Sequence, residues 1–310
     1  MNKTDSCSRN VTTMNSGLIL LNKRAGLTSF EALGEVKRAL GTGKVGHTGT
    51  LDKFASGLLV VLAGRALKLS PWFSHCDKQY TGKIHFGTET DTLDPEGSPV
   101  AEAAVPSREK VEQVLTQFTG DILQEPPAYS AIHVNGRRAS QLARSGKAPE
   151  MKKRPVSVHK LDLLSWQPPF AEIFVHCSSG TYIRSLARDI ALAAGSRAHL
   201  CELTRTQVAG FTLDMADSEA AAFLRPIDKA VIMALGLPWF EVTLPEAEKL
   251  IHGKPLAPVL EGKPLFLQWE VPVETSGDFS AAVFAGETLV AVVEKTGEKW
   301  KYGCVVGEIT

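Results

Sequence analysis

The sequence predicts an α+β fold with a second, smaller domain at the C-terminus. Strand-like segments alternate irregularly with helical ones, and no regular β-α-β repeat is present, which favours the α+β class. From about residue 238, short strand-like segments are separated by glycine and proline turns, which is typical of a small β-rich domain. Residues 1–15 lack a core-forming pattern and are expected to be a disordered leader. We therefore expect the main domain at 16–237 and the small domain at 238–310.

The composition is that of an ordinary globular protein. The chain has 310 residues, of which 44% are hydrophobic and 22% charged, enough for one large domain and a small one. Apolar runs of membrane-spanning length are absent, and the first fifteen residues contain no hydrophobic signal core, so a cytoplasmic location is expected. The five cysteines are odd in number and never form a C-x-x-C pair, which indicates a reducing compartment and argues against a zinc site.

Charge is distributed unevenly although the net charge is zero. Residues 211–310 sum to −7 and residues 1–210 to +7. The strongest basic segment, Arg137 to Lys160, carries eight basic residues and one acid. Such runs are usually solvated surface, but this density in a neutral chain favours contact with phosphates. We call residues 136–160 the basic arm; its candidate contacts to an RNA backbone are Arg137, Arg138, Arg144, Lys147, Lys152, Lys153 and Arg154.

The first elements of the main domain follow from local patterns. Residues 17–22 form an apolar strand. Thr28 begins a helix, because Glu31 lies three residues further on and completes a capping box, and Gly41 ends that helix. Residues 58–69 continue as an apolar strand and a short helix.

The rest of the main domain is predicted in the same way. Alternating polarity predicts strands, and Gly120 ends a helix. The acidic segment 91–97 lacks the alternating oxygen ligands of a calcium loop, so it is expected to be a turn between strands. The expected elements are strands at 78–86, 156–166 and 170–177, helices at 107–118 and from about 179 to 194, and a C-terminal hairpin within 284–294.

A glycine-rich loop at 45–57 carries one carboxylate, Asp52, between two core elements. Such a position suits a residue that faces a ligand. The glycines at 41, 43 and 46 spell G-x-G-x-x-G, but the preceding segment is helical and no helix follows them. A dinucleotide site is therefore not expected here.

Four segments, in order, resemble the motifs of bacterial tRNA pseudouridine synthases of the TruB family. They read G-H-T-G-T-L-D at 46–52, K-Q-Y at 78–80, G-T-Y-I-R at 180–184 and H-L-C-E-L-T-R at 199–205. The resemblance extends over about residues 16–235. The sequence departs from the family pattern at Arg24, where the family usually has proline. It departs again at Lys53-Phe54, where the family usually has proline and leucine.

The resemblance implies a fold and a set of site residues. The fold is the pseudouridine synthase fold, a mixed, mostly antiparallel sheet around a central cleft, with a PUA-like C-terminal domain. Asp52 is implied as the essential catalytic carboxylate and Arg184 as the partner that holds it ionised and aimed. The implied substrate contacts are Tyr80, Tyr182 and Leu203 as pocket walls, His47 as the residue that occupies the space left by the flipped base, and Lys23 at the end of the first strand.

Without the resemblance these residue types have ordinary explanations. A strand tyrosine such as Tyr80 usually packs in the core, an arginine such as Arg184 usually forms a surface ion pair, and a loop histidine such as His47 usually makes local hydrogen bonds.

The resemblance also implies the reaction, which is isomerisation of uridine 55 in the T arm of tRNA to pseudouridine after the base is flipped out of its stack. This reaction needs no redox cofactor, metal or nucleotide. The implied partner is the tRNA T stem-loop, with no membrane and no obligatory protein partner, and the chain is expected to be a monomer. Two alternatives stay open: a synthase of the same fold acting on another RNA, such as ribosomal RNA, and a non-catalytic RNA-binding or RNA-chaperone protein.

Overall fold

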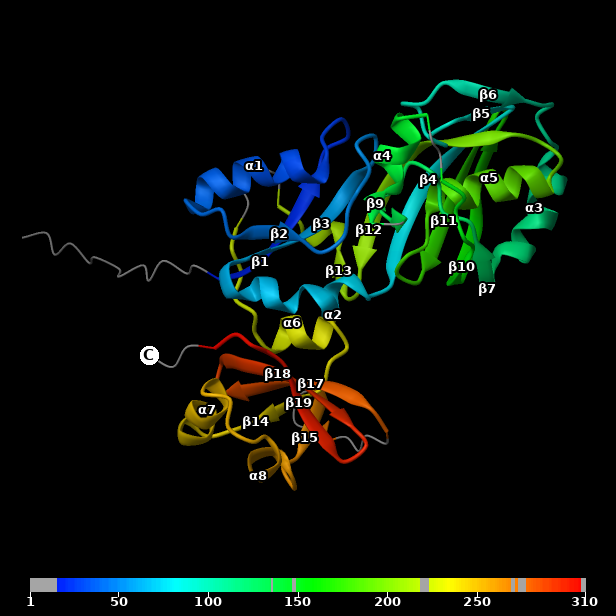
Figure 1. Ribbon diagram of the computed structural model, residues 1–310. Coiled ribbons are helices and arrows are strands. Elements are labelled where there is room, and N and C mark those ends of the chain that lie inside the picture. Colours follow the sequence, from blue (N-terminus) through cyan, green and yellow to red (C-terminus); the bar gives the residue numbers. More distant parts are fainter. Residues whose placement is uncertain are drawn as a thin grey trace, which may run out of the picture.

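The computed structural model describes residues 16–134, 136–146, 149–217, 223–268, 271–272 and 277–307. The predicted leader at 1–15 and Lys147 of the basic arm lie outside these residues. Figure 1 shows a larger body that contains the N-terminal strands and helices and a smaller strand-rich unit below it, with the short helix α6 (Lys229–Ala234) between them. Within the described residues, no helix is long and apolar enough to cross a membrane.

The larger body is built on one mixed sheet. Its path is β1-β3-β12-β4-β11-β10-β7, with β2 paired to β3 and β13 paired to β12. All of these pairs are antiparallel except β12 with β3, which confirms the mostly antiparallel sheet. The strands are β1 (Gly17–Lys23), β2 (Val45–His47), β3 (Ser56–Ala63), β4 (Lys78–Phe86), β7 (Gly120–Gln124), β10 (Arg154–Gln167), β11 (Phe170–Cys177), β12 (Ala198–Val208) and β13 (Phe211–Thr212).

The helices of this body and two small hairpins complete it. The hairpins pair β5 (Thr88–Thr90) with β6 (Pro99–Glu102) and β8 (His133–Val134) with β9 (Arg137–Arg138). The helices are α1 (Ser29–Leu40), α2 (Ser70–Ser74), α3 (Arg108–Leu115), α4 (Ala139–Arg144) and α5 (Ile183–Ala193), and the 3-10 helices are η1 (Gly64–Leu69), η2 (Thr116–Phe118) and η3 (Leu213–Met215).

The smaller unit is a six-stranded sheet in the order β16-β15-β14-β17-β18-β19. Its strands are β14 (Trp239–Glu241), β15 (Leu265–Gln268), β16 (Val271–Pro272), β17 (Phe279–Ala285), β18 (Thr288–Thr296) and β19 (Lys299–Val305), and its helices are α7 (Leu244–Ile251) and α8 (Ala257–Leu260). The antiparallel pairing of β17 with β18 confirms the predicted hairpin.

Local sequence signals placed several elements correctly. The Thr28–Glu31 capping box is present, and Gly41 ends α1 with φ 61°, a left-handed conformation that glycine adopts without the penalty of a Cβ atom. The strands predicted at 78–86 and 170–177 have those bounds. The acidic segment 91–97 is a turn between β5 and β6, as expected.

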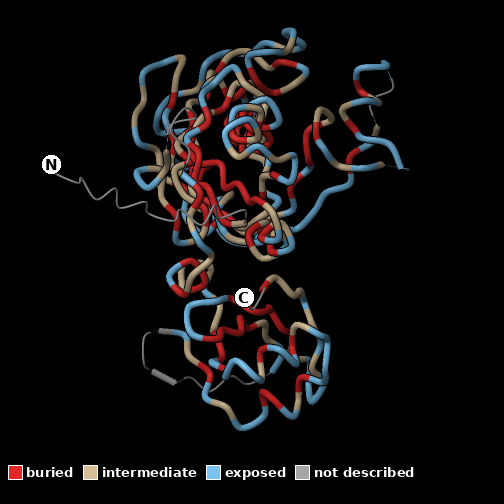
Figure 2. The backbone as a smooth tube through the Cα atoms, turned by 90° about the vertical axis from the view of Figure 1, so that its left-hand side faces the viewer, coloured by how far each residue is buried: buried red, intermediate tan, exposed pale blue. Residues whose placement is uncertain are grey.

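Two apolar cores lie on the two faces of the main sheet. Figure 2 shows buried backbone running through the interior of the larger body and of the smaller unit. One face packs against α1, α3 and α5. The other packs against η1, α2 and α6 and continues into the smaller unit through buried Trp239 and Phe284. Arg65 Nη1 and Lys68 Nζ of η1 also donate to the carbonyls of Gly307 (3.1 Å) and Val305 (2.8 Å). The smaller unit is therefore joined to the larger body by apolar packing and by hydrogen bonds.

Candidate active site

The loop between β2 and β3 presents Asp52, and α1 fixes it in place. The Ser29 hydroxyl, in the first turn of α1, donates to the carbonyl of Leu51 (2.9 Å) and accepts from its amide (2.8 Å). The Leu51 side chain is buried, and the Asp52 carbonyl accepts from the Ala55 amide (3.2 Å). The backbone on both sides of Asp52 is thus held, so the carboxylate has a defined direction.

Arg184 meets the Asp52 carboxylate with two nitrogen atoms. Nε lies 2.9 Å from Asp52 Oδ2, and Nη2 donates to Oδ1 at 3.2 Å. The guanidinium also donates to the carbonyls of Thr92 (2.7 Å) and Tyr129 (3.1 Å). Only 5% of the Arg184 side chain is exposed, so the fork that grips Asp52 is rigid.

Asp94 completes this arrangement, although no role was predicted for it. Its Oδ2 accepts from Arg184 Nη1 (3.1 Å), while Oδ1 accepts from the Thr92 hydroxyl (2.6 Å) and the Glu96 amide (3.0 Å). Its side chain is 7% exposed. The apolar Leu93, which is buried within an otherwise polar turn, was a signal that this turn packs inward. Asp94 therefore anchors Arg184 from the side opposite Asp52.

Burial raises the pKa of the Asp52 carboxyl, and the neighbouring Arg184 only partly opposes this effect. The charge of Asp94 adds to the rise. Arg184 therefore favours the ionised form of Asp52, as expected, but it lowers the pKa by less than burial raises it. Asp52 keeps 36% of its side-chain surface accessible and lines the cavity.

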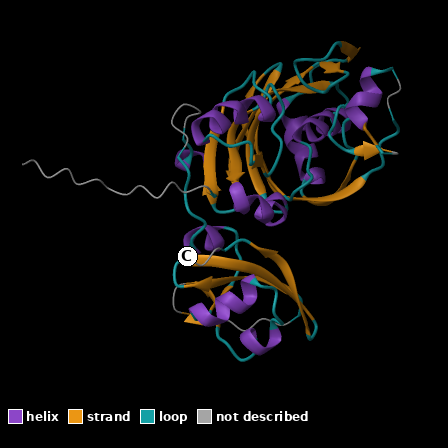
Figure 3. Cartoon of the chain, turned by 60° about the vertical axis from the view of Figure 1, so that its left-hand side comes forward, coloured by secondary structure: helices purple, strands orange, loops and turns teal. Residues whose placement is uncertain are grey.

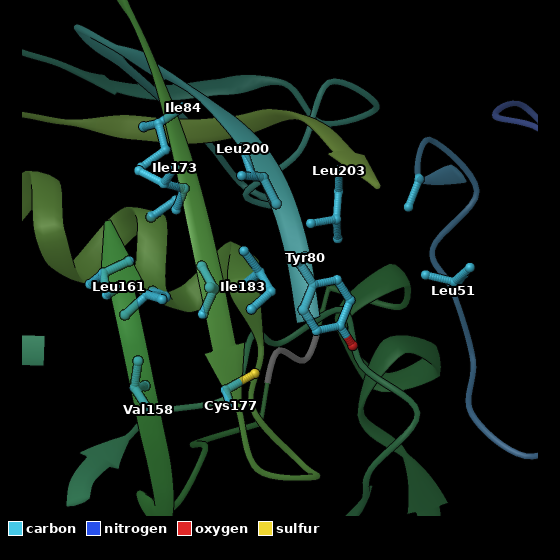
Figure 4. Close-up of a cluster of buried hydrophobic side chains, with 14 of the residues drawn as sticks. Leu51, Tyr80, Ile84, Val158, Leu161, Ile173, Cys177, Ile183, Leu200 and Leu203 are labelled. Carbon is cyan, nitrogen blue, oxygen red and sulfur yellow. The ribbon is translucent and has the colours of Figure 1, made fainter. Parts of the chain in front are cut away.

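A cavity of about 450 Å³ opens above the Asp52–Arg184 pair. Of the predicted site residues, Asp52, Arg184, Tyr80, Tyr182 and Leu203 line it, and Arg138 and Arg144 of the basic arm line it as well. Figure 4 shows Tyr80, Leu203 and Leu51 at one end of the cluster of buried side chains that supports the cavity. The structure thus brings together residues from five separate segments of the chain.

Arg205 lines the cavity, and no role was predicted for it from the sequence. It is 2% exposed, and its Nε and Nη2 donate to the carbonyls of Leu58 (2.7 Å) and Gly49 (3.0 Å). It also hydrogen-bonds to the Tyr80 hydroxyl, whose pKa is raised because burial outweighs the effect of Arg205. Gly57 is required beside it: its φ is 102°, and an added Cβ would lie 2.3 Å from the Arg205 carbonyl oxygen. Arg205 thus fastens β12 to the loop that carries Asp52.

Lys23 and His47 are not among the residues that line the cavity. Lys23 is fully buried, and its ammonium donates to the carbonyls of Arg24 (3.0 Å), Leu27 (2.7 Å) and Ala55 (2.6 Å). Lys23 therefore ties β1 to the loop that follows Asp52. His47 is part of β2, and burial, followed by the charge of Arg205, lowers its pKa, which favours the neutral imidazole. Contact of either residue with a substrate stays a prediction.

The basic arm contains β9 and α4, and β9 pairs with β8 just before the arm; together they project from the side of the larger body in Figure 3. Its glycines Gly136 and Gly146 have φ angles of 78° and 73°, a left-handed conformation that glycine adopts without strain. The described lysines and arginines of the arm are all exposed; they are Arg137, Arg138, Arg144, Lys152, Lys153, Arg154 and Lys160. The arm thus lines one side of the cavity and presents further cations to solvent.

Two solved structures share the fold of this chain. A structure titled as a Cbf5-Nop10-Gar1 complex matches 96% of this chain and 84% of its own chain, with a TM-score of 0.67 and 23% identity. A structure titled as an archaeal box H/ACA sRNP Nop10-Cbf5 complex matches 97% and 88%, with a TM-score of 0.68 and 21% identity. The mixed sheet with a cleft at its centre is therefore a known arrangement.

The sequence comparisons identify the family. Residues 37–183 match the family described as TruB family pseudouridylate synthase (N terminal domain). The tRNA pseudouridine synthase B of Borreliella burgdorferi (strain ZS7) is 37% identical over 93% of this chain and 99% of its own length. The enzyme of the same name from Corynebacterium efficiens is 37% identical over 92% of this chain and 94% of its own. The chain belongs to the TruB family of pseudouridine synthases.

Proposed function

We propose that this protein converts uridine 55 in the T arm of tRNA to pseudouridine. The observation that carries the proposal is the Asp52 carboxylate, gripped by Arg184 at the base of a cavity walled by Tyr80 and Tyr182. The name that the family relatives share, tRNA pseudouridine synthase B, supports tRNA as the substrate.

The shape of the site supports base flipping. A cavity of about 450 Å³ has room for a nucleoside, and a base inside an RNA stack cannot reach a carboxylate at the base of such a cavity. The target uridine must therefore leave its stack, at a cost of a few kcal/mol. Stacking and apolar contact with Tyr80, Tyr182 and Leu203 would offset part of that cost.

The reaction is an isomerisation. The bond from ribose C1′ to uracil N1 breaks, the base turns, and C1′ bonds to C5; C5 loses a proton and N1 gains one. Asp52 is the group that acts, either by adding to the substrate or by removing a proton from the sugar, and both routes need it ionised. Arg184 favours that state and fixes the direction of the carboxylate.

The basic arm is proposed to bind RNA phosphates. Its exposed cations suit a polyanion, and Arg138 and Arg144 would place the arm over the RNA beside the cavity. We assign catalysis to residues 16–237 and a PUA-like role to 238–310, whose excess of acids fits weak contact with RNA. We further propose a cytoplasmic monomer that acts without an obligatory protein partner.

The test is to map pseudouridines in RNA from cells that lack the protein and in transcribed tRNA treated with the purified protein alone. The proposal expects loss at position 55 in the cells and formation at that position in vitro, with no product from a tRNA that carries cytidine there. Loss confined to ribosomal RNA would support the synthase with another substrate. A full set of pseudouridines in the cells that lack the protein, with none formed in vitro although the tRNA is bound, would support the non-catalytic alternative.

A further inference from the structure

Outside the cavity, three side chains with metal-binding atoms meet on the outer face of the main sheet. Asp77, His159 and His176 each offer one ligand atom, and these atoms all lie within 4.8 Å of one another. Asp77 Oδ2 is 3.1 Å from His159 Nε2 and 3.9 Å from His176 Nε2. Within the described part of the chain this is the one such group of three.

Sheet geometry explains why these distant residues converge. His176 on β11 pairs with Gln79 on β4, and Asp77 lies two residues before Gln79, so Asp77 and His176 point to the same face. A register shift in β10 leaves His159 unpaired between Val158 and Lys160. At such a bulge two successive residues oppose one residue of the partner strand, and here both His159 and Lys160 are exposed on the face that carries His176.

The chemistry of the group favours a divalent transition metal over an anion. Two imidazoles and a carboxylate are the ligand types that suit Zn²⁺, and a carboxylate would repel phosphate. The ammonium of Lys160, which pairs with His176 across the strands, is 3.0 Å from Asp162 Oδ2 and lies over the Phe174 ring, so its charge is partly neutralised. With zinc–ligand bonds of about 2.0–2.1 Å, tetrahedral geometry places ligand atoms roughly 3.3 Å apart. The two measured separations from Asp77 bracket that value.

We propose that Asp77, His159 and His176 bind one divalent transition-metal ion, with zinc the best fit, and that water fills the remaining coordination positions. The ion fastens the start of β4 to β10 and β11 on the outer face. Asp77 is followed directly by Lys78, which lines the cavity from the inner face, so the ion steadies the strand that also carries Tyr80. Its role is structural, because none of its three ligand residues lines the cavity that holds Asp52.

The proposal predicts saturable zinc binding by the full-length protein. After treatment with chelator and dialysis, titration with ZnCl₂ in a calorimeter should show one ion per chain at this site. His159→Ala, His176→Ala and Asp77→Asn should each weaken binding at least about tenfold, because even the loss of a group that only supports a ligand costs about 10- to 100-fold. The matched control is His252→Ala, since His252 is exposed on the smaller unit and hydrogen-bonds to a backbone carbonyl.

Two further readouts separate this site from others. Cobalt bound here should give visible absorption without a thiolate charge-transfer band, which excludes the nearby Cys76 as the ligand. Zinc should raise the melting temperature of the wild-type protein and the His252→Ala variant but not of the Asp77→Asn/His176→Ala variant, whose pseudouridine formation should stay within a few-fold of normal. Zinc affinity unchanged in that double variant, or no binding by the wild-type protein with zinc in excess, would overturn the proposal.

Discussion

The Asp94→Asn substitution is predicted to damage the site through geometry, although it changes one oxygen to a nitrogen. Both carboxylate oxygens of Asp94 accept hydrogen bonds: Oδ1 from Thr92 and the Glu96 amide, and Oδ2 from Arg184. An asparagine has one acceptor and one donor there. Whichever way it turns, its NH₂ group faces either the Arg184 guanidinium or the Glu96 amide.

The size of the effect follows from burial. Hydrogen bonds to charged groups contribute about 1.5–3 kcal/mol, and removing one partner of a buried ion pair costs roughly 3–5 kcal/mol. In the variant, Arg184 would still have Asp52 and two carbonyl acceptors as partners. We therefore expect the loss in the free energy of unfolding to be about 2–3 kcal/mol, as for one hydrogen bond to a charged group. Displacing Arg184 also misdirects Asp52, and misplacement by about 1 Å can lower a rate by about 100-fold.

Urea unfolding measures the loss of stability, and tritium release from C5-labelled uridine in tRNA measures the loss of activity. The control is Glu96→Gln in the same turn, because the Glu96 carboxylate pairs with Lys53 at 3.4 Å on the surface and such pairs contribute little. The plateau of kcat/KM should fall in Asp94→Asn and stay near the wild-type level in Glu96→Gln, because only the first change leaves Asp52 misdirected. Normal stability and a normal plateau would refute the anchoring role of Asp94.

Three further predictions concern charge and reactivity. Arg184→Met should lose nearly all activity, and Arg184→Lys should lose much of it. Because Arg184 lowers the pKa of Asp52, the acid limb of the pH profile should move to higher pH in the Met variant. Normal turnover with an unmoved acid limb would contradict this role of Arg184. Reversal of the basic residues at 152–154 to Glu should weaken tRNA binding and reduce the log-log salt slope by about one unit or less per lost contact, and an unchanged slope would return the arm to ordinary solvated surface. Cys177 is fully buried, and burial raises its pKa to about 12, so it should resist iodoacetamide at pH 8 in the folded protein and react only on unfolding, as peptide mass mapping would show.

Much of the fold could be predicted because its signals are local. Thr28 and Gly41 mark the ends of α1 through capping chemistry, and alternating polarity marks β4. The Asp52 loop and the Arg184 segment were found because their motifs are contiguous. Their contact, which joins residues 132 positions apart, was implied only by the family resemblance.

The remaining features depend on packing between distant segments, which a single sequence does not display. The sequence around Asp94 is typical of a surface turn, and only the structure shows that the β5–β6 turn packs on Arg184. Lys23 matched a substrate contact by motif, but its ammonium is satisfied by backbone carbonyls outside the cavity lining. His159 reaches His176 only because of a register shift in β10 that no pattern in the sequence marks.

The most direct test of the proposed mechanism is turnover by the Asp52→Asn variant, measured as tritium release from C5-labelled uridine in tRNA. The amide keeps the shape of the side chain and removes the group that acts on the substrate. We expect no detectable turnover, with tRNA binding within a few-fold of the wild-type protein. Turnover comparable to wild type in a correctly folded Asp52→Asn variant would contradict the assignment of Asp52 as the catalytic group.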